Sequence, residues 1–270
     1  MISREPEFFP PSRNMFGRLG RSVVFSFRET GRAVVLLVMA ILAMRHMFKK
    51  RSRTEIVVQM FVFGIKSLGV ITVVAIFTGM ILALQTGLAL RQFNQEVNIG
   101  TAVMVSMLRE MGPFMTGLIL AACVGSAIAA QIGTMVVSEE IAALEIMSID
   151  PVRYLVMPRL VAMLIMTPML AFYMCIMGVI GGGLVGQTQL GVSWDAYIDN
   201  ATRFAEVKDL VVGMFKAFLF GGIITVVACH QGFATTQGAV GVGFATRKAV
   251  IVSFLLILVV GYFVTRIFYV

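Results

Sequence analysis

Long runs of apolar residues, with few charged positions inside them, recur along the 270-residue chain. A bilayer has a hydrocarbon core about 30 Å thick, which roughly 20 residues of α-helix can cross. Five runs approach or exceed this length, although Lys216 interrupts the fourth. The pattern predicts an all-α, polytopic membrane protein with five transmembrane helices, at about residues 62–90, 100–137, 160–187, 209–231 and 247–268.

A sixth apolar run, Ala33 to Met44, is only 12 residues long and carries basic residues on both sides. A basic-flanked helix of this length should lie along the membrane interface rather than cross it. We therefore expect an interfacial helix over residues 33–50, preceded by a cytoplasmic N-terminal segment over residues 1–32. No second domain is visible, so residues 33–270 are expected to form one membrane domain.

Composition supports this interpretation, because 59% of the residues are hydrophobic and 13% are charged, whereas about a quarter of an ordinary soluble domain is charged. The formal net charge of +8 would suit a nucleic-acid binder. However, 12 of the 22 Lys and Arg residues precede Ser67, and the aromatic residues near them form no recognisable nucleic-acid module. We therefore expect no nucleic-acid partner.

Positive charge is distributed unevenly between the two sides of five predicted spans. With the N-terminus inside, the cytoplasmic segments 1–66, 139–159 and 232–248 hold 16 Lys and Arg residues, and the opposite side holds four. Because positive residues accumulate on the cytoplasmic side, the N-terminus should be cytoplasmic and the C-terminus external. Residues 195–209 then form an external amphipathic segment. The first 30 residues lack an apolar core followed by a cleavage site, so no removable signal peptide is expected.

The usual motifs of catalysis and metal binding are missing from the sequence. Its three cysteines, Cys123, Cys175 and Cys229, lie in apolar runs without CxxC spacing, which argues against a disulfide framework and a zinc site. There is no GxxxxGK[ST] phosphate-binding loop and no Ser/His/Asp set. The residues from Gly181 to Gly186 satisfy GxGxxG, but inside a span they indicate close helix packing. We therefore expect no enzymatic activity, cofactor or metal in this chain.

Three charged residues fall inside or at the edge of the predicted spans: Arg109, Glu110 and Lys216. Each would cost about 2.5 to 3.5 kcal/mol at the centre of the bilayer, so it should face a cavity, a partner or an interface. In one interpretation, Arg109 and Glu110 pair locally near a helix end and Lys216 reaches toward the interface. In the other, all three line a polar part of a substrate path.

A short amphipathic helix is predicted at residues 138–148, in the loop between the second and third spans. Ser138 can cap its start, with Glu139 and Glu140 in the first turn, and Asp150 before Pro151 would stop it. Three apolar residues share one face of this helix: Ile141, Leu144 and Met147. A solvated surface helix does not need such a face, which favours docking into a groove of another protein.

Several short motifs in the centre of the chain are similar to those of one family. They are Leu108-Arg-Glu-Met-Gly-Pro-Phe114, Val124-Gly-Ser-Ala127, Ile132-Gly-Thr-Met135, Glu139-Glu-Ile-Ala-Ala-Leu-Glu-Ile-Met147 and Asp150-Pro-Val-Arg-Tyr-Leu-Val-Met-Pro-Arg159. From about Gly31 onward the chain resembles the MlaE (YrbE) family of ABC transporter permeases. Residues Gly79 to Gln85 and Lys216 are supporting matches.

The resemblance implies a homodimeric permease in the inner membrane of a diderm bacterium, or in a plastid-type envelope. Such a permease moves phospholipid between that membrane and a periplasmic MCE-domain carrier and so maintains outer-membrane lipid asymmetry. Its expected partners are phospholipid, an ABC ATPase subunit that binds ATP and Mg, the MCE-domain protein and, in many systems, a STAS-domain protein. Two alternatives stay open: a permease for another hydrophobic solute, such as a sterol or an aromatic toxicant, and a membrane scaffold that transports nothing.

The resemblance also assigns roles to residues. It implies that the helix at 138–148 couples the permease to the ATPase, through Glu139, Glu140, Ile141, Leu144, Met147, Asp150, Pro151 and Arg153. It places Arg109, Glu110 and Lys216 around the lipid cavity. Four residues of the first span recur at helical spacing and offer an apolar wall for acyl chains: Val73, Phe77, Met80 and Leu84.

Three positions depart from the family pattern. Cys123 and Gln131 stand where the family usually has an arginine and a glutamate, eight residues apart on one helix. The loss of both is expected to leave no unpaired buried charge, as for an ion pair removed as a unit. Gly261 lies near the expected place of an acidic residue of the last span.

Overall fold

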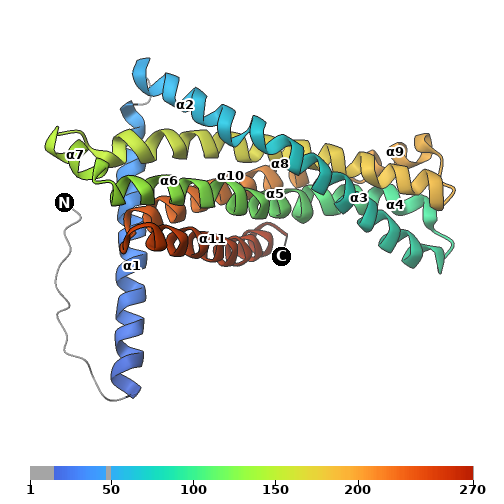
Figure 1. Cartoon of the computed structure of the whole chain (residues 1–270). Coiled ribbons are helices and arrows are strands. Elements are labelled where there is room, and N and C mark those ends of the chain that lie inside the picture. The colour runs from blue at the N-terminus through green and yellow to red at the C-terminus, as the bar shows by residue number, and fades with distance from the viewer. Residues whose placement is uncertain (1–14, 47–49, 270) are drawn as a thin grey trace.

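The computed structural model of the chain describes residues 15–46 and 50–269, and within these residues it contains helices and turns without a strand (Figure 1). Its α-helices are α1 (Met15–Ala43), α2 (Lys50–Phe63), α3 (Leu68–Arg91), α4 (Ile99–Ser106), α5 (Gly112–Leu120), α6 (Ser126–Val137), α7 (Glu140–Ile146), α8 (Met157–Gln189), α9 (Trp194–Arg203), α10 (Val207–Phe233) and α11 (Gly238–Tyr269). Two π-helical turns join helices end to end, η4 (Met107–Met111) between α4 and α5 and η5 (Ala121–Gly125) between α5 and α6, and a third, η6 (Val152–Val156), leads into α8.

Five continuous helical stretches among the described residues are long and apolar enough to cross a membrane: Ser52–Arg91, Glu96–Val137, Val152–Gln189, Val207–Phe233 and Gly238–Tyr269. The predicted all-α fold with five spans is therefore confirmed. Each stretch exceeds its predicted bounds at one or both ends, because polar residues on the surface continue the helix beyond the uncharged run. Arg53 and Glu55, for example, are exposed on α2 and do not interrupt it.

Helix α1 differs from the interfacial helix predicted over residues 33–50, because it begins at Met15 and ends at Ala43. Its first half mixes basic and apolar residues, and a search for uncharged runs does not detect such a helix. Figure 1 shows α1 crossing the end of the bundle at which α7 lies. Leu36 and Ala40 are buried against the bundle, whereas the apolar residues around them are mostly exposed. This arrangement suits a helix that lies on a membrane surface.

Glycine residues allow α3 and α8 to pack with their backbones in direct contact. A Cβ atom on Gly79 would collide with the carbonyl oxygen of Gly178, and one on Gly181 would collide with the carbonyl oxygen of Ile76. The glycine-rich stretch is thus a helix-packing surface, as the sequence indicated, and not a dinucleotide site.

Helix α9 covers the end of the molecule opposite α7 (Figure 1). Its Tyr197 is fully buried, and the phenol donates a hydrogen bond to the carbonyl oxygen of Val179 at 3.0 Å. Burial raises the pKa of Tyr197, so the phenol stays protonated and remains a donor. Ser193 caps the helix by accepting a hydrogen bond from the backbone N–H of Ala196. Most of the segment predicted over 195–209 is therefore the helix α9, which packs against the bundle, and its last residues begin α10 (Val207–Phe233).

Candidate functional site

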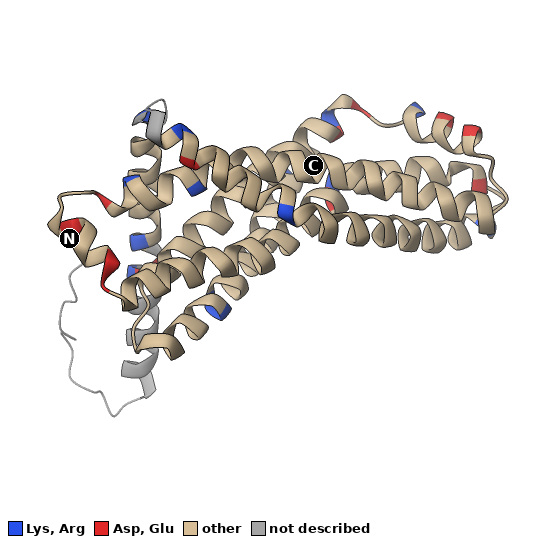
Figure 2. Ribbon diagram, turned by 45° about the horizontal axis from the view of Figure 1, so that its top comes forward, with Lys and Arg blue, Asp and Glu red and all other residues tan. Residues whose placement is uncertain are grey.

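Charged residues gather midway along the molecule, close to the C-terminus, as well as at its two ends (Figure 2). The first part of this central cluster is an ion pair between Arg109 of η4 and Asp209 of α10. Arg109 Nε lies 2.6 Å from Asp209 Oδ1, and its Nη2 lies 3.2 Å from Oδ2. Tyr269 donates a hydrogen bond to Oδ1 at 2.8 Å, and its ring centre lies 4.6 Å from Arg109 Cζ. The carboxylate of Asp209 is fully buried, so these donors replace water around it.

The second part of the cluster surrounds the ammonium group of Lys216, which is fully buried. Lys216 Nζ donates to Glu110 Oε1 at 2.6 Å, to the carbonyl oxygen of Arg109 at 2.7 Å and to Thr265 Oγ1 at 2.7 Å. An ammonium group has three N–H donors, and each of them has an acceptor here. Lys216 is therefore paired within its own chain.

Local sequence explains why η4 provides these groups. Pro113 has no backbone N–H, so it cannot return a hydrogen bond to the carbonyl oxygen of Arg109, four residues earlier. That oxygen accepts a hydrogen bond from Lys216 instead. The π-helical turn also shifts the helix register, as is common at functional sites. Arg109 and Glu110 consequently point to two different partners on α10.

The pairing contradicts the first sequence interpretation of these three charges, whereas the second, a polar part of a substrate path, stays a prediction. Arg109 and Glu110 do not pair with each other, and Lys216 is buried within the bundle rather than reaching toward the interface. Each ion pair instead joins a fully buried side chain, Asp209 or Lys216, to a partly exposed one. The side chains of Arg109 and Glu110 are 39% and 42% exposed. The guanidinium of Arg109 therefore lies at the exposed edge of the cluster, where its Nη1 takes no part in the bonds to Asp209.

The predicted apolar wall of the first span lies mostly on the outside of the single chain. Val73, Phe77 and Leu84 are exposed on α3, whereas Met80 is partly buried and packs against the core. Met80 is therefore less exposed than the other three residues of the predicted wall. The other three form an open apolar face.

The loop helix is shorter than predicted, and its ends are made differently. Ser138 ends α6 and does not cap α7, whose first residue, Glu140, follows Glu139 in the left-handed conformation with φ of 60°. At the other end, Ser148 has φ of 58° and donates its backbone N–H to the carbonyl oxygen of Glu145, while Ile149 donates to that of Leu144. This is a Schellman motif, which usually contains glycine and so gave no signal in the sequence.

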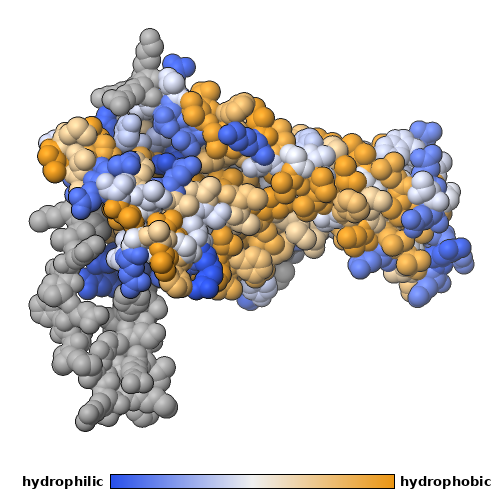
Figure 3. All heavy atoms as spheres, in the orientation of Figure 1, coloured by the Kyte–Doolittle hydropathy of each residue, from blue (hydrophilic) through white to orange (hydrophobic). Residues whose placement is uncertain are grey.

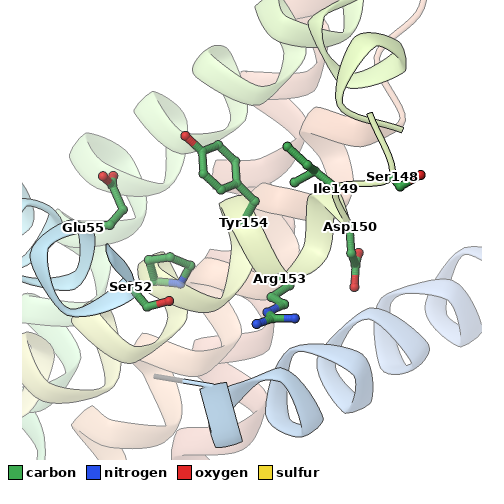
Figure 4. Close-up of a pocket in the computed structure, with 8 residues that line it drawn as sticks. Ser52, Glu55, Ser148, Ile149, Asp150, Arg153 and Tyr154 are labelled. Atoms are coloured by element: carbon green, nitrogen blue, oxygen red, sulfur yellow. The ribbon is translucent and has the colours of Figure 1, made fainter. Parts of the chain in front are cut away.

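The Asp150-Pro151 pair begins the next helix and does not stop α7. Asp150 Oδ1 accepts a hydrogen bond from the backbone N–H of Val152 at 3.0 Å, as an N-cap residue does. Pro151 occupies the first turn, where its missing N–H removes no hydrogen bond. Asp150 and Arg153 line a hollow of about 380 Å³ between α2 and η6, together with Ser52, Glu55, Ser148, Ile149, Tyr154 and Pro158 (Figure 4).

The apolar residues of α7 differ in exposure. Ile141 and Leu144 are only partly exposed, whereas Met147 is 61% and Ile146 is 85% exposed. The most prominent apolar residue at this end is therefore Ile146, which lies off the face predicted from Ile141, Leu144 and Met147. Such a protruding apolar tip is typical of a docking surface.

Comparisons with known proteins agree with this architecture. The family model described as Permease MlaE matches residues 56–267. The intermembrane phospholipid transport system permease protein MlaE of Haemophilus influenzae is 33% identical over 259 residues, which cover 95% of this chain and 98% of the relative. The chain belongs to the MlaE permease family. A probable ABC transporter permease protein of Rickettsia prowazekii is 41% identical over 214 residues, covering 79% of this chain and 83% of the relative.

The three departures from the MlaE pattern have different surroundings. Cys123 is exposed, and Gly261 packs against the ring of Phe220. Gln131 accepts a hydrogen bond from Nη2 of the buried Arg159 at 3.3 Å. The expectation that no unpaired buried charge remains is therefore wrong, because among the described residues no carboxylate lies within salt-bridge distance of Arg159.

Sequence reasoning missed three members of the central cluster of this MlaE permease: Asp209, Thr265 and Tyr269. Asp209 was assigned to the external segment, although it lies seven residues before Lys216 and hence on the same face of a helix. Thr265 and Tyr269 are four residues apart on α11, which also places them on one face. Helical spacing from Lys216 was the signal for Asp209, whereas nothing in the sequence paired α11 with η4.

Proposed function

We propose that this chain is the membrane subunit of an ABC transporter that moves phospholipid, with ATP and Mg bound by a separate ATPase subunit. The observation that carries the proposal is a charged cluster inside the bundle that is paired on one side and open at Arg109 on the other. A phospholipid has an anionic phosphate and two apolar chains, so it needs a cation beside an apolar surface. The names of the relatives support this substrate class.

The apolar face of α3 supports the rest of the lipid site. Val73, Phe77 and Leu84 are exposed in a single chain, and two copies facing each other would enclose these residues. We therefore propose a homodimer in a bacterial inner membrane, with the acyl chains between the copies. Arg109 would bind the headgroup phosphate through Nη1, and the pairs with Asp209 and Lys216 would hold Arg109 and Glu110 in place.

The end of the bundle that carries α7 is the proposed ATPase side. Ile146 and Met147 protrude there, and this segment lies between Glu139 and Arg153, within the stretch that resembles a coupling helix. An N-terminus in the cytoplasm places this end inside the cell, as the charge asymmetry of the sequence predicts. The opposite end, covered by α9, would then face the MCE-domain carrier. A STAS-domain subunit is a further proposed partner of the ATPase.

Site-specific photo-crosslinking in cells tests the lipid site. A crosslinking amino acid replaces Phe77, and a matched variant carries it at Leu256, an exposed apolar residue of α11. Phospholipid should be trapped at Phe77 several times more often than at Leu256, because only Phe77 would line the space between the copies. Equal labelling would overturn the lipid site, and a trapped sterol or aromatic solute would favour the alternative substrate class.

A further inference from the structure

Arg159, near the start of α8, is a buried cation without a carboxylate in salt-bridge distance among the residues that the structure describes. Only 7% of the residue is exposed. Its Nη1 donates to the carbonyl oxygen of Leu155 at 2.8 Å, and its Nη2 donates to Gln131 Oε1 at 3.3 Å. Its buried Nε has no hydrogen-bond partner within the described part of the chain. Both acceptors are neutral, so these contacts leave the positive charge without a counter-ion and the Nε–H without an acceptor.

A hollow of about 200 Å³ lies beside this guanidinium, between α2, α6 and α8. It is lined by Glu55, Gln59, Met135, Tyr154, Leu155, Pro158 and Arg159. Three of these residues, Glu55, Tyr154 and Pro158, also line the hollow of about 380 Å³ that contains Arg153 (Figure 4). Arg153 and Arg159 thus line two adjoining hollows at the α7 end of the bundle.

We propose that this hollow binds a phosphate group through Arg159, and that the phosphate belongs to a phospholipid headgroup in the membrane leaflet on the α7 side. A guanidinium with a free N–H matches a phosphate oxygen in charge and geometry. Helix α2 carries exposed apolar residues within two turns of Glu55, at Val57, Val58 and Phe61, which can contact acyl chains. The proposal rests on the proposed function and adds a second lipid site, distinct from the Arg109 cluster.

The carboxylate of Glu55 lines the same hollow and should weaken the binding of an anion there, so changing Glu55 tests the proposed site. Its Oε1 accepts a hydrogen bond from Gln59 Nε2 at 2.8 Å, on the surface of the same hollow. A carboxylate at the mouth repels an anionic ligand. The change Glu55→Gln should thus strengthen phosphate binding at Arg159 while keeping the size of the side chain.

Native mass spectrometry of the full chain in detergent, titrated with phosphatidic acid, tests the site without ATP. Two variants change Arg159: Arg159→Gln removes the charge, and Gln131→Glu supplies a carboxylate where Gln131 Oε1 now accepts from Nη2. The second variant should keep the fold, because it leaves Arg159 in place with an internal counter-ion. The matched control is Arg247→Gln, which removes an exposed charge on α11 outside both hollows.

Both variants should bind phosphatidic acid about tenfold or more weakly than the unchanged chain and the Arg247→Gln control. Affinity in Gln131→Glu equal to that of the unchanged chain would overturn the site. A parallel titration with inorganic phosphate identifies the source of the ligand: competition at millimolar phosphate would assign the site to soluble phosphate and overturn the lipid assignment. Normal binding here by a complex that transports no lipid would refute the proposed function and leave this site intact.

Discussion

Lys216 and Arg159 are both cations buried in the helix bundle, but they differ in what surrounds them. The ammonium group of Lys216 has a carboxylate, a carbonyl and a hydroxyl as acceptors. The guanidinium of Arg159 has one carbonyl, one neutral amide and an unpartnered Nε. A buried charge is stable only when it is paired or hydrogen-bonded. The fold thus supplies acceptors for all three N–H groups of Lys216, whereas the guanidinium of Arg159 can still bind an anionic ligand.

The largest expected effect comes from leaving Lys216 unpaired. Glu110→Ala removes the carboxylate from a fully buried ammonium group and should lower the free energy of unfolding by about 3 kcal/mol or more. Lys216→Met should cost less, because it leaves behind Glu110, which is partly exposed and can be solvated. Denaturant unfolding in detergent measures both values. An equal cost for the two variants would contradict the asymmetry of the pair.

The next effect concerns the end of α7, where Ile146 is exposed and Leu144 is only partly exposed. Ile146→Asp should weaken binding of the ATPase by tenfold or more, since a docking residue can contribute 1 to 4 kcal/mol. It should leave the unfolding temperature unchanged, because Ile146 is 85% exposed. Leu144→Asp should lower that temperature as well. The control is Phe93→Asp, which changes an exposed apolar residue at the opposite end of the bundle. An equal loss of ATPase binding in this control would contradict the assignment of Ile146 to the ATPase interface.

A smaller effect is expected at the Arg109–Asp209 pair. Tyr269→Phe removes the phenol that donates to Asp209 but keeps the ring beside Arg109. A hydrogen bond to a charged group contributes about 1.5 to 3 kcal/mol, so the variant should unfold more easily by about that amount. Tyr262→Phe removes an exposed phenol from the same helix and should have no effect. If both variants behave alike, the bond to Asp209 contributes nothing.

The smallest effect has the opposite sign. Gln131→Glu gives Arg159 a carboxylate and should raise the free energy of unfolding by about 1 kcal/mol, the charge-assisted bond being offset by burial of the new carboxylate. The same change with Arg159→Gln already present should be destabilising, because the carboxylate then lacks a cation. A double-mutant cycle measures this coupling, and no coupling between the two positions would contradict the contact.

The sequence predicted the five spans and the family, because runs of uncharged residues and short motifs depend on local pattern alone. It singled out Arg109, Glu110 and Lys216 as charges that need a partner or a cavity, because charges are costly in a membrane, and each is in an ion pair. It did not predict their partners, since the contacts from η4 to α10 and α11 join residues about 100 or more positions apart. The end of α7 was also missed, since a serine occupies a left-handed position that glycine usually fills.

The exposure of the apolar wall depends on more than one chain. Spacing correctly placed Val73, Phe77 and Leu84 on one side of α3, but periodicity cannot distinguish a lipid-facing side from a side that faces a second copy. Met80 was included by the same spacing, although it packs against the core. The contact of Gln131 with Arg159 likewise requires the packing of α6 beside α8, which no local pattern encodes.

The most direct test of the central claim is ATP-dependent transfer of a labelled phospholipid by the transporter complex reconstituted in vesicles. The change Arg109→Gln removes the cation at the open edge of the cluster, and Arg247→Gln removes an exposed cation elsewhere. We expect the unchanged complex and Arg247→Gln to transfer lipid, whereas Arg109→Gln should lose at least nine-tenths of the transfer but retain the ATPase. Undiminished transfer by Arg109→Gln, or ATP hydrolysis without lipid movement by the unchanged complex, would contradict this expectation.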